Sequence, residues 1–126
     1  MATAPSQPQR TVTCHCKAIR LTFPPLREPA LECFCSICRR YGALWAYYKE
    51  DEVHVEGSDA IEGYVRGEKR LCFNRCKNCG CMTHYTVLRD TEPRVAVNCR
   101  MMGRKEFREL ESYESEGEGE GDEDGV

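Results

Sequence analysis

The spacing of the cysteines limits what this sequence can fold into more than any other feature. Ten of its 126 residues are cysteine. Seven of the ten form three short clusters, Cys14-His-Cys16, Cys33-Phe-Cys35-Ser-Ile-Cys38 and Cys76-Lys-Asn-Cys79. Thiols separated by one or two residues reach one metal ion from a single turn, and zinc takes four such ligands about 2.3 Å away. The clusters therefore predict a fold whose loops meet around metal.

The first and last clusters together supply one complete zinc site. Cys14 and Cys16 precede Cys76 and Cys79 by about sixty residues, and the two pairs provide the four thiolates of a closed structural site. Gly80 follows Cys79 directly, as expected where the chain turns sharply beneath a metal. We therefore expect these four cysteines to bind a structural zinc.

The middle cluster predicts a second zinc with an open position. Cys33, Cys35 and Cys38 offer three thiolates, and catalytic zinc sites use three protein ligands and leave the fourth place to water or substrate. The alternative is a closed site, in which another side chain supplies the fourth ligand. The candidates for that ligand are Cys72, Cys81, Cys99, His15, His54 and His84.

Metal binding is a better explanation for the thiols than disulfide formation. The first ten residues lack the apolar stretch of a secretory signal, and cysteines of proteins that are not exported stay reduced. No apolar run approaches the ~20 residues of a membrane-spanning helix. We therefore expect a cytoplasmic protein, with the nucleus as the other compartment open to it, and no membrane partner.

Between the clusters the sequence predicts short β-strands. Apolar and polar residues alternate over 18–23, as in a half-buried strand. The other expected strands are 44–48, 53–55, 61–65, 71–73, 84–88 and 94–97. Glycines and prolines punctuate them, and only two short helical segments are expected, one after Cys35 and one over 104–110. The predicted class is mostly β, with connections too short for parallel crossovers.

Both ends of the chain fall outside the expected domain. Residues 1–10 are rich in Pro, Gln and Ser, and we expect a flexible arm there. Residues 111–126 contain eight acidic residues, no Lys or Arg and almost no apolar side chain, so an acidic disordered tail is expected. The zinc-binding domain is therefore assigned to residues 11–110.

The three motifs, in this order, resemble the glutathione-dependent formaldehyde-activating enzyme family, which also includes centromere protein V. The resemblance spans about residues 12–102 and is carried by Cys14-His-Cys-Lys-Ala-Ile-Arg20, Cys33-Phe-Cys-Ser-Ile-Cys-Arg-Arg40 and Cys76-Lys-Asn-Cys-Gly80. It implies a β-tent fold, in which small antiparallel sheets surround zinc. It also implies the ligand sets above, with the middle cluster around the catalytic ion.

The resemblance further implies a carbon–sulfur lyase that reversibly adds glutathione to formaldehyde to give S-hydroxymethylglutathione. Two zinc ions per chain and glutathione as co-substrate are expected. Glutathione sulfur would take or approach the open position beside Cys33, Cys35 and Cys38, since zinc lowers the pKa of a bound thiol. Three thiolates make zinc electron-rich, so we expect it to present a thiolate rather than to activate a carbonyl strongly. Other glutathione adducts are alternative substrates.

Substrate-binding candidates are arginines and aromatic residues near the middle cluster. Arginine suits the two carboxylates of glutathione because it binds a carboxylate with two hydrogen bonds. An aromatic strand can line a pocket, although it equally suits a small core. The candidates are Arg39, Arg40, Arg100, Trp45 and Tyr48, with Tyr47 in the same strand.

A zinc module without catalysis is the alternative function. Outside the acidic tail, basic residues outnumber acidic ones, and such modules bind nucleic acid, chromatin or a protein partner. The basic residues are dispersed, however, and the sequence has no recognition helix or base-stacking motif. We therefore favour the enzyme over nucleic-acid binding. No feature of the sequence indicates an oligomeric state.

Overall fold

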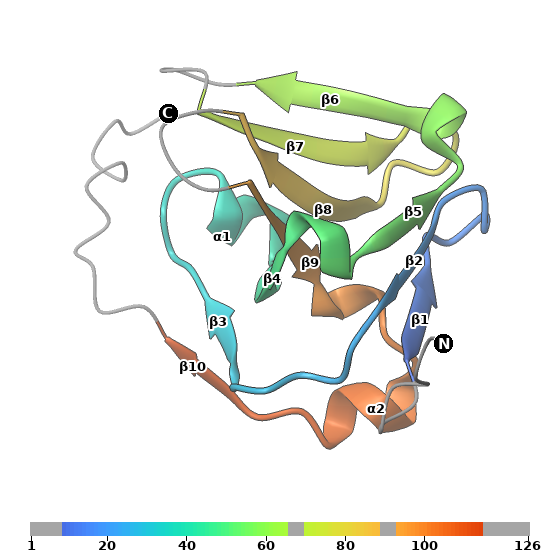
Figure 1. Ribbon diagram of the computed structural model, residues 1–126. Coiled ribbons are helices and arrows are strands. Elements are labelled where there is room, and N and C mark those ends of the chain that lie inside the picture. Colours follow the sequence, from blue (N-terminus) through green and yellow to red (C-terminus); the bar gives the residue numbers. More distant parts are fainter. Residues whose placement is uncertain (1–8, 66–69, 89–92, 115–126) are drawn as a thin grey trace.

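The computed structural model describes residues 9–65, 70–88 and 93–114, and within these ranges the chain is mostly β (Figure 1). The strands are β1 (Arg10–Thr13), β2 (Arg20–Phe23), β3 (Ala30–Glu32), β4 (Leu44–Lys49), β5 (His54–Glu56), β6 (Ile61–Val65), β7 (Leu71–Cys76), β8 (Met82–Val87), β9 (Arg94–Asn98) and β10 (Ser112–Glu114). The helical elements are α1 (Cys38–Tyr41), α2 (Arg104–Arg108) and the 3-10 turns η1 (Glu50–Glu52), η2 (Ser58–Ala60) and η3 (Cys99–Met101). The expected class is confirmed. No described helix has the length and apolar character needed to cross a membrane.

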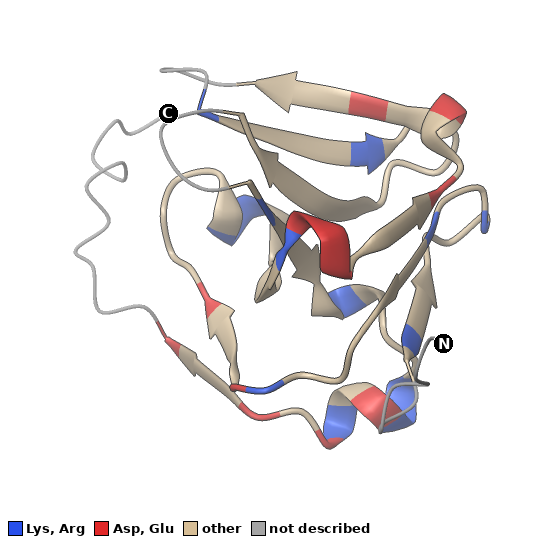
Figure 2. Cartoon of the chain, in the orientation of Figure 1, with Lys and Arg blue, Asp and Glu red and all other residues tan. Residues whose placement is uncertain are grey.

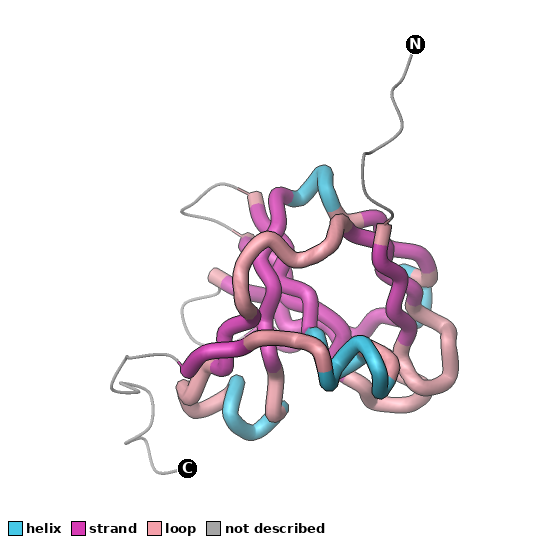
Figure 3. Tube along the Cα trace, turned by 90° about the horizontal axis from the view of Figure 1, so that it is seen from below, coloured by secondary structure: helices cyan, strands magenta, loops and turns pink. Residues whose placement is uncertain are grey.

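The strands form two sheets. One has the order β1-β2-β5 and the other β10-β3-β4-β9-β8-β7-β6. Figure 1 shows β1, β2 and β5 on one side of the molecule and β3 and β10 on the opposite side, with β4 and β9 between them. Figure 3 shows from below how strands dominate over the short helices. Neighbouring strands are antiparallel except β10, which runs parallel to β3. This parallel pair differs from the purely antiparallel sheets that were expected.

Two clusters of buried side chains lie on the two faces of β4 and β9. Ala46 and Tyr48 belong to the larger cluster, which also contains the buried residues of β1 and β2, whereas Trp45 belongs to the smaller cluster with Phe73 and Ala96. Successive side chains of a strand point to opposite faces of its sheet, so one aromatic strand contributes to both clusters. The small sheet covers one face, and the three cysteines of the middle motif pack at the other.

All seven strands expected from the sequence are present, as β2 and β4–β9, but the ends of the domain differ from expectation. Ser112–Glu114 fall in the expected disordered tail, yet they form β10, with Tyr113 opposite Leu31. Arg10 belongs to β1 and pairs with Phe23 rather than lying in a free arm. These parts of the expectation are wrong because the two segments are held by backbone pairing with a neighbouring strand. Such pairing does not require a particular pattern of side chains in the sequence. Residues 1–8 and 115–126 lie outside the described residues.

Candidate metal centres and substrate pocket

Four cysteines from two distant loops meet at the carboxyl end of β7. Cys14 and Cys16 lie between β1 and β2, while Cys76 ends β7 and Cys79 lies in the following turn. Their Sγ atoms lie within 4.8 Å of one another, with 3.8 Å between Cys14 and Cys16 and 3.5 Å between Cys16 and Cys76. A tetrahedral zinc with 2.3 Å bonds separates its sulfurs by about 3.8 Å. This four-cysteine cluster therefore fits one zinc ion, and all ten cysteines are free thiols.

Two tight turns direct these thiols toward a common point. Lys17 and Gly80 both have left-handed backbones, with φ of 70° and 82°. The N–H of Lys17 donates to the carbonyl of Cys14 at 3.0 Å, and that of Gly80 donates to the carbonyl of Cys76 at 2.7 Å. Gly80 takes this conformation without the steric cost that a Cβ brings. The turns also aim N–H groups at sulfur, and those of Cys81 and Cys16 lower the pKa of Cys79 to about 5.

Cys33, Cys35 and Cys38 form a second group, the three-cysteine cluster, beside α1. Their Sγ atoms lie within 4.8 Å of one another, and no fourth Cys, His, Asp or Glu from the described residues joins them. The six side chains considered above as a fourth ligand are all described and are all outside the group. An all-thiol donor set suits zinc. Both clusters can therefore hold a metal ion, one with four ligands and the other with three.

The short helix α1 and the start of β4 hold the three-cysteine cluster in place. The N–H of Arg39 donates to the Cys35 carbonyl at 3.1 Å, and the N–H of Ala43 to the Cys38 carbonyl at 3.3 Å. The indole N–H of Trp45 donates to Cys38 Sγ at 3.4 Å. Hydrogen bonds from the Cys33 and Cys38 thiols, together with backbone N–H groups, lower the pKa of Cys35. The protein thus stabilises negative charge on Cys35, whereas hydrogen bonds to other thiols of the cluster raise the pKa values of Cys33 and Cys38.

A pocket of about 440 Å³ adjoins the three-cysteine cluster, and we call it the thiol pocket. Besides the three cysteines, it is lined by Ile37, Trp45, Tyr47, Arg70, Leu71, Phe73 and Tyr85. These residues come from β4, β7 and β8, from Ile37 just before α1 and from Arg70 just before β7. A pocket with mostly apolar walls and a few converging polar groups has the form of a small-molecule site.

Two tyrosines bring hydroxyl groups into the apolar wall. The Tyr47 and Tyr85 rings pack edge to face, with ring centroids 6.3 Å apart. Burial raises the pKa of both phenols. Both therefore stay protonated at neutral pH, which makes them hydrogen-bond donors rather than bases.

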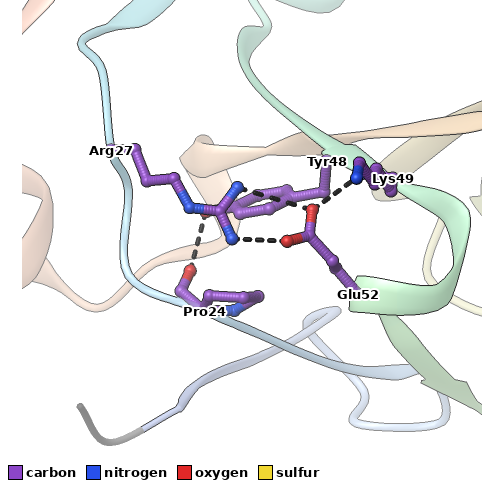
Figure 4. A network of polar contacts seen from close by, with 5 residues as sticks. All are labelled: Pro24, Arg27, Tyr48, Lys49 and Glu52. Atoms are coloured by element: carbon purple, nitrogen blue, oxygen red, sulfur yellow. Dashed lines mark hydrogen bonds and ion pairs between the residues drawn. The ribbon is translucent and has the colours of Figure 1, made fainter. Parts of the chain in front are cut away.

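The structure separates the two aromatic candidates of β4. Trp45 lines the thiol pocket, but Tyr48 lies on the opposite face, 3% exposed, and its hydroxyl donates to the Pro24 carbonyl at 2.8 Å. Figure 4 shows the Tyr48 ring beside Arg27, whose guanidinium pairs with Glu52. Tyr48, which was expected to bind substrate, therefore lies outside the thiol pocket. Residues three apart in a strand face opposite sides, and Tyr47 is the neighbour that shares the pocket with Trp45.

The arginines expected near substrate are not among the residues that line the pocket. Arg40 donates to the Ser36 carbonyl at 2.7 Å within its own helical turn. Arg100 donates to the Gly42 carbonyl at 2.7 Å and lies 5.0 Å from the Phe107 ring centroid. Arg39, on α1, is likewise absent from the lining. The lining arginine is Arg70, which sequence reasoning missed because its place beside the cysteines depends on pairing between β7 and β8.

Comparisons with known proteins agree with this fold and these clusters. The family model of the glutathione-dependent formaldehyde-activating enzyme matches residues 9–113, which include both clusters and the thiol pocket. A crystal structure of a Rhodobacter sphaeroides protein has 26% sequence identity and a TM-score of 0.68, over 82% of this chain and 100% of that chain. No curated protein matches the chain at a significant level.

Proposed function

Because the chain belongs to the glutathione-dependent formaldehyde-activating enzyme family, we propose that it is a zinc-dependent carbon–sulfur lyase acting on glutathione adducts. The reaction is the reversible addition of the glutathione thiol to formaldehyde, which gives S-hydroxymethylglutathione. One observation carries the proposal: three thiols converge beside a pocket, and no fourth ligand from the described residues joins them. That donor set leaves a place for a substrate thiol. Such an enzyme belongs in the cytoplasm, where glutathione is held reduced.

A zinc ion held by Cys33, Cys35 and Cys38 would favour the thiolate form of a substrate thiol at its open position. The chain's own residues bind and orient the adduct. Arg70 presents a guanidinium to a glutathione carboxylate, because a charged pair of hydrogen bonds is the strongest contact available in this lining. Tyr85 lines the pocket and offers its hydroxyl proton to the oxygen of the adduct, since burial keeps the phenol protonated. In the addition the sulfur–carbon bond forms and the thiol proton ends on that oxygen.

The charges of the described residues favour this enzyme over a nucleic-acid module. Several basic residues are paired with acidic ones, including Arg75 with Glu62 at 3.0 Å and Arg10 with Glu106 at 3.1 Å. Figure 2 shows Lys and Arg interleaved with Asp and Glu on α2 and across β6 and β7. A phosphate backbone binds best to a continuous basic surface, which these pairs interrupt.

The test is metal content together with catalysed exchange between formaldehyde and S-hydroxymethylglutathione, followed by magnetisation-transfer NMR. The wild-type protein should contain two zinc ions per chain and accelerate the exchange. Cys35→Ser should lose one zinc and the activity while it remains folded. Cys72→Ser is the matched control, because Cys72 lies outside both clusters. This variant should keep two zinc ions and the activity. One zinc per wild-type chain, or exchange no faster than without protein, would refute the proposal.

A further inference from the structure

We propose that the thiol pocket takes glutathione adducts of aldehydes that carry a bulky apolar or aromatic group, in preference to the adduct of formaldehyde. This inference rests on the proposed function, because it names the substrate class of the same site. The sulfur of glutathione bonds to the aldehyde carbon, the carbonyl becomes a hydroxyl, and the thiol proton ends on that oxygen. The reverse step breaks the same bond, and neither direction requires an oxidant or a reductant.

The pocket is larger than a formaldehyde unit needs. Its volume is about 440 Å³, whereas formaldehyde has only two heavy atoms, and a single water molecule takes about 30 Å³ of liquid. Volumes of this order are typical of pockets that hold whole drug-sized ligands. Either the tripeptide of glutathione or the group on the adduct carbon must therefore fill most of the space.

The walls suit an apolar group better than the tripeptide. Six of the lining residues are apolar or aromatic, namely Ile37, Trp45, Tyr47, Leu71, Phe73 and Tyr85. Glutathione carries two carboxylates and an ammonium group, and each loses hydration when it is buried without a partner. Among the described lining residues Arg70 is the one cation, so it can pair with one carboxylate. The tripeptide therefore belongs at the rim beside Arg70, and the apolar interior is left for the adduct group.

The aromatic side chains around the pocket already pack against one another, and an aromatic ligand would add one more ring to this packing. Tyr85 packs edge to face with Trp45, at 4.7 Å between centroids, and with Phe73, at 5.4 Å. Trp45 and Phe73 are each 1% exposed, so the wall is held by the core, while Tyr47 keeps 39% of its surface exposed. Edge-to-face and offset contacts are the preferred geometry between rings. A further ring in the pocket gains such contacts from Tyr47 and Tyr85, which keep exposed surface.

This wall lies within reach of the reacting atoms. The cysteines of the three-cysteine cluster and the aromatic residues line the same pocket, and the indole of Trp45 is hydrogen-bonded to Cys38 Sγ. In an adduct, the group that comes from the aldehyde is attached to the carbon that bears the sulfur. A sulfur directed to the three-cysteine cluster therefore brings this group directly against the wall.

The first test measures binding without turnover. S-benzylglutathione and S-methylglutathione are titrated into the zinc-loaded protein and followed by fluorescence of Trp45, the single tryptophan. The benzyl compound should bind at least about tenfold more tightly, the discrimination that an apolar pocket provides for added carbon groups. Leu71→Ala should reduce this preference severalfold. Leu88→Ala, at a half-exposed leucine outside the lining, should retain it. Equal affinities, or a preference unchanged in Leu71→Ala, would overturn the inference.

The second test compares the exchange of glutathione with formaldehyde and with phenylacetaldehyde by the same NMR method. A value of kcat/KM at least tenfold higher for phenylacetaldehyde supports the inference. Turnover of formaldehyde at an equal or higher value overturns the inference and leaves the proposed function standing. Absence of catalysis with both aldehydes overturns the proposed function, and the inference with it. Tyr47→Ser supplies a second pocket variant if Leu71→Ala does not fold, and it should lower the ratio of the two kcat/KM values.

Discussion

The indole N–H of Trp45 donates a hydrogen bond to Sγ of Cys38 at 3.4 Å, which joins the central sheet to the three-cysteine cluster. Cys38 lies in α1, but Trp45 lies in β4, between β3 and β9. A donor to a ligating sulfur stabilises the thiolate and orients it, as groups next to metal ligands commonly do. The geometry of the site therefore depends on a residue whose ring is part of the core.

Replacement of Trp45 by Phe should weaken metal binding at the three-cysteine cluster. The variant keeps a ring in the core but loses the N–H donor, and loss of such a contact typically costs about tenfold in metal affinity. Competition with a chromophoric chelator should show one zinc ion bound more weakly than in the wild type and one bound with unchanged affinity. Tyr48→Phe is the control, because it removes a hydroxyl from the same strand on the opposite face. Two unchanged affinities in Trp45→Phe would show that the hydrogen bond has no role.

Gly80→Ala should destabilise the four-cysteine cluster. Gly80 has φ of 82°, and an added Cβ would meet no atom within 4 Å, so the cost is conformational and amounts to roughly 1–2 kcal/mol. Urea unfolding of the zinc-loaded protein should show a lower midpoint. Gly103→Ala is the matched control, since Gly103 has φ of −65°, which alanine adopts readily. Equal midpoints for the two variants would contradict the account of the turn.

Arg70→Gln should raise KM for the glutathione adduct by about tenfold, because it removes the charged partner of a carboxylate. The value of kcat should change much less, since Arg70 does not contact the reacting atoms in this account. Arg100→Gln should leave KM unchanged, because Arg100 is hydrogen-bonded to the Gly42 carbonyl and lies outside the lining. Steady-state kinetics of both variants distinguish a carboxylate contact at Arg70 from one at Arg100. A larger effect on KM in Arg100→Gln would favour the assignment expected from sequence.

Stability should fall below neutral pH because of His84. Its side chain is 2% exposed, its Nδ1 lies 2.7 Å from Thr83 Oγ1, and burial lowers its pKa to about 4. The unfolded state has the ordinary pKa of about 6.5 and binds a proton that the folded state excludes. The contribution of His84 is thus complete above pH 6.5 and is lost between pH 6.5 and 4, on the order of 3 kcal/mol.

Urea unfolding with excess zinc at pH 7.5 and 5.0 measures this dependence. His84→Asn should lose less stability between the two pH values than the wild type, although it starts from a lower value. His54→Asn is the control, because the His54 side chain is 70% exposed, and it should follow the wild type. Identical pH dependences for wild type and His84→Asn would refute the role of burial at His84.

The fold was largely predictable because strand signals are local. Alternation and turn residues indicated β2 and β4 to β9, and the two short helical segments are α1 and α2. The strands that were missed, β1, β3 and β10, have four, three and three residues. β2 and β5 are as short, but alternating residues indicated them. The missed strands depend on a neighbour that offers a hydrogen-bonding edge.

The grouping of the cysteines into motifs follows from the sequence alone, because cysteines two or three positions apart reach a common point from one turn. What surrounds them depends on tertiary packing. It placed Tyr47 rather than Tyr48 in the thiol pocket, and Arg70 rather than Arg39, Arg40 or Arg100 in its lining. Which face of a strand is buried depends on the segments that pack against it. That packing brings together residues that lie tens of positions apart in the sequence. Local spacing therefore identifies the candidate metal ligands, whereas the lining of the pocket depends on packing between distant segments.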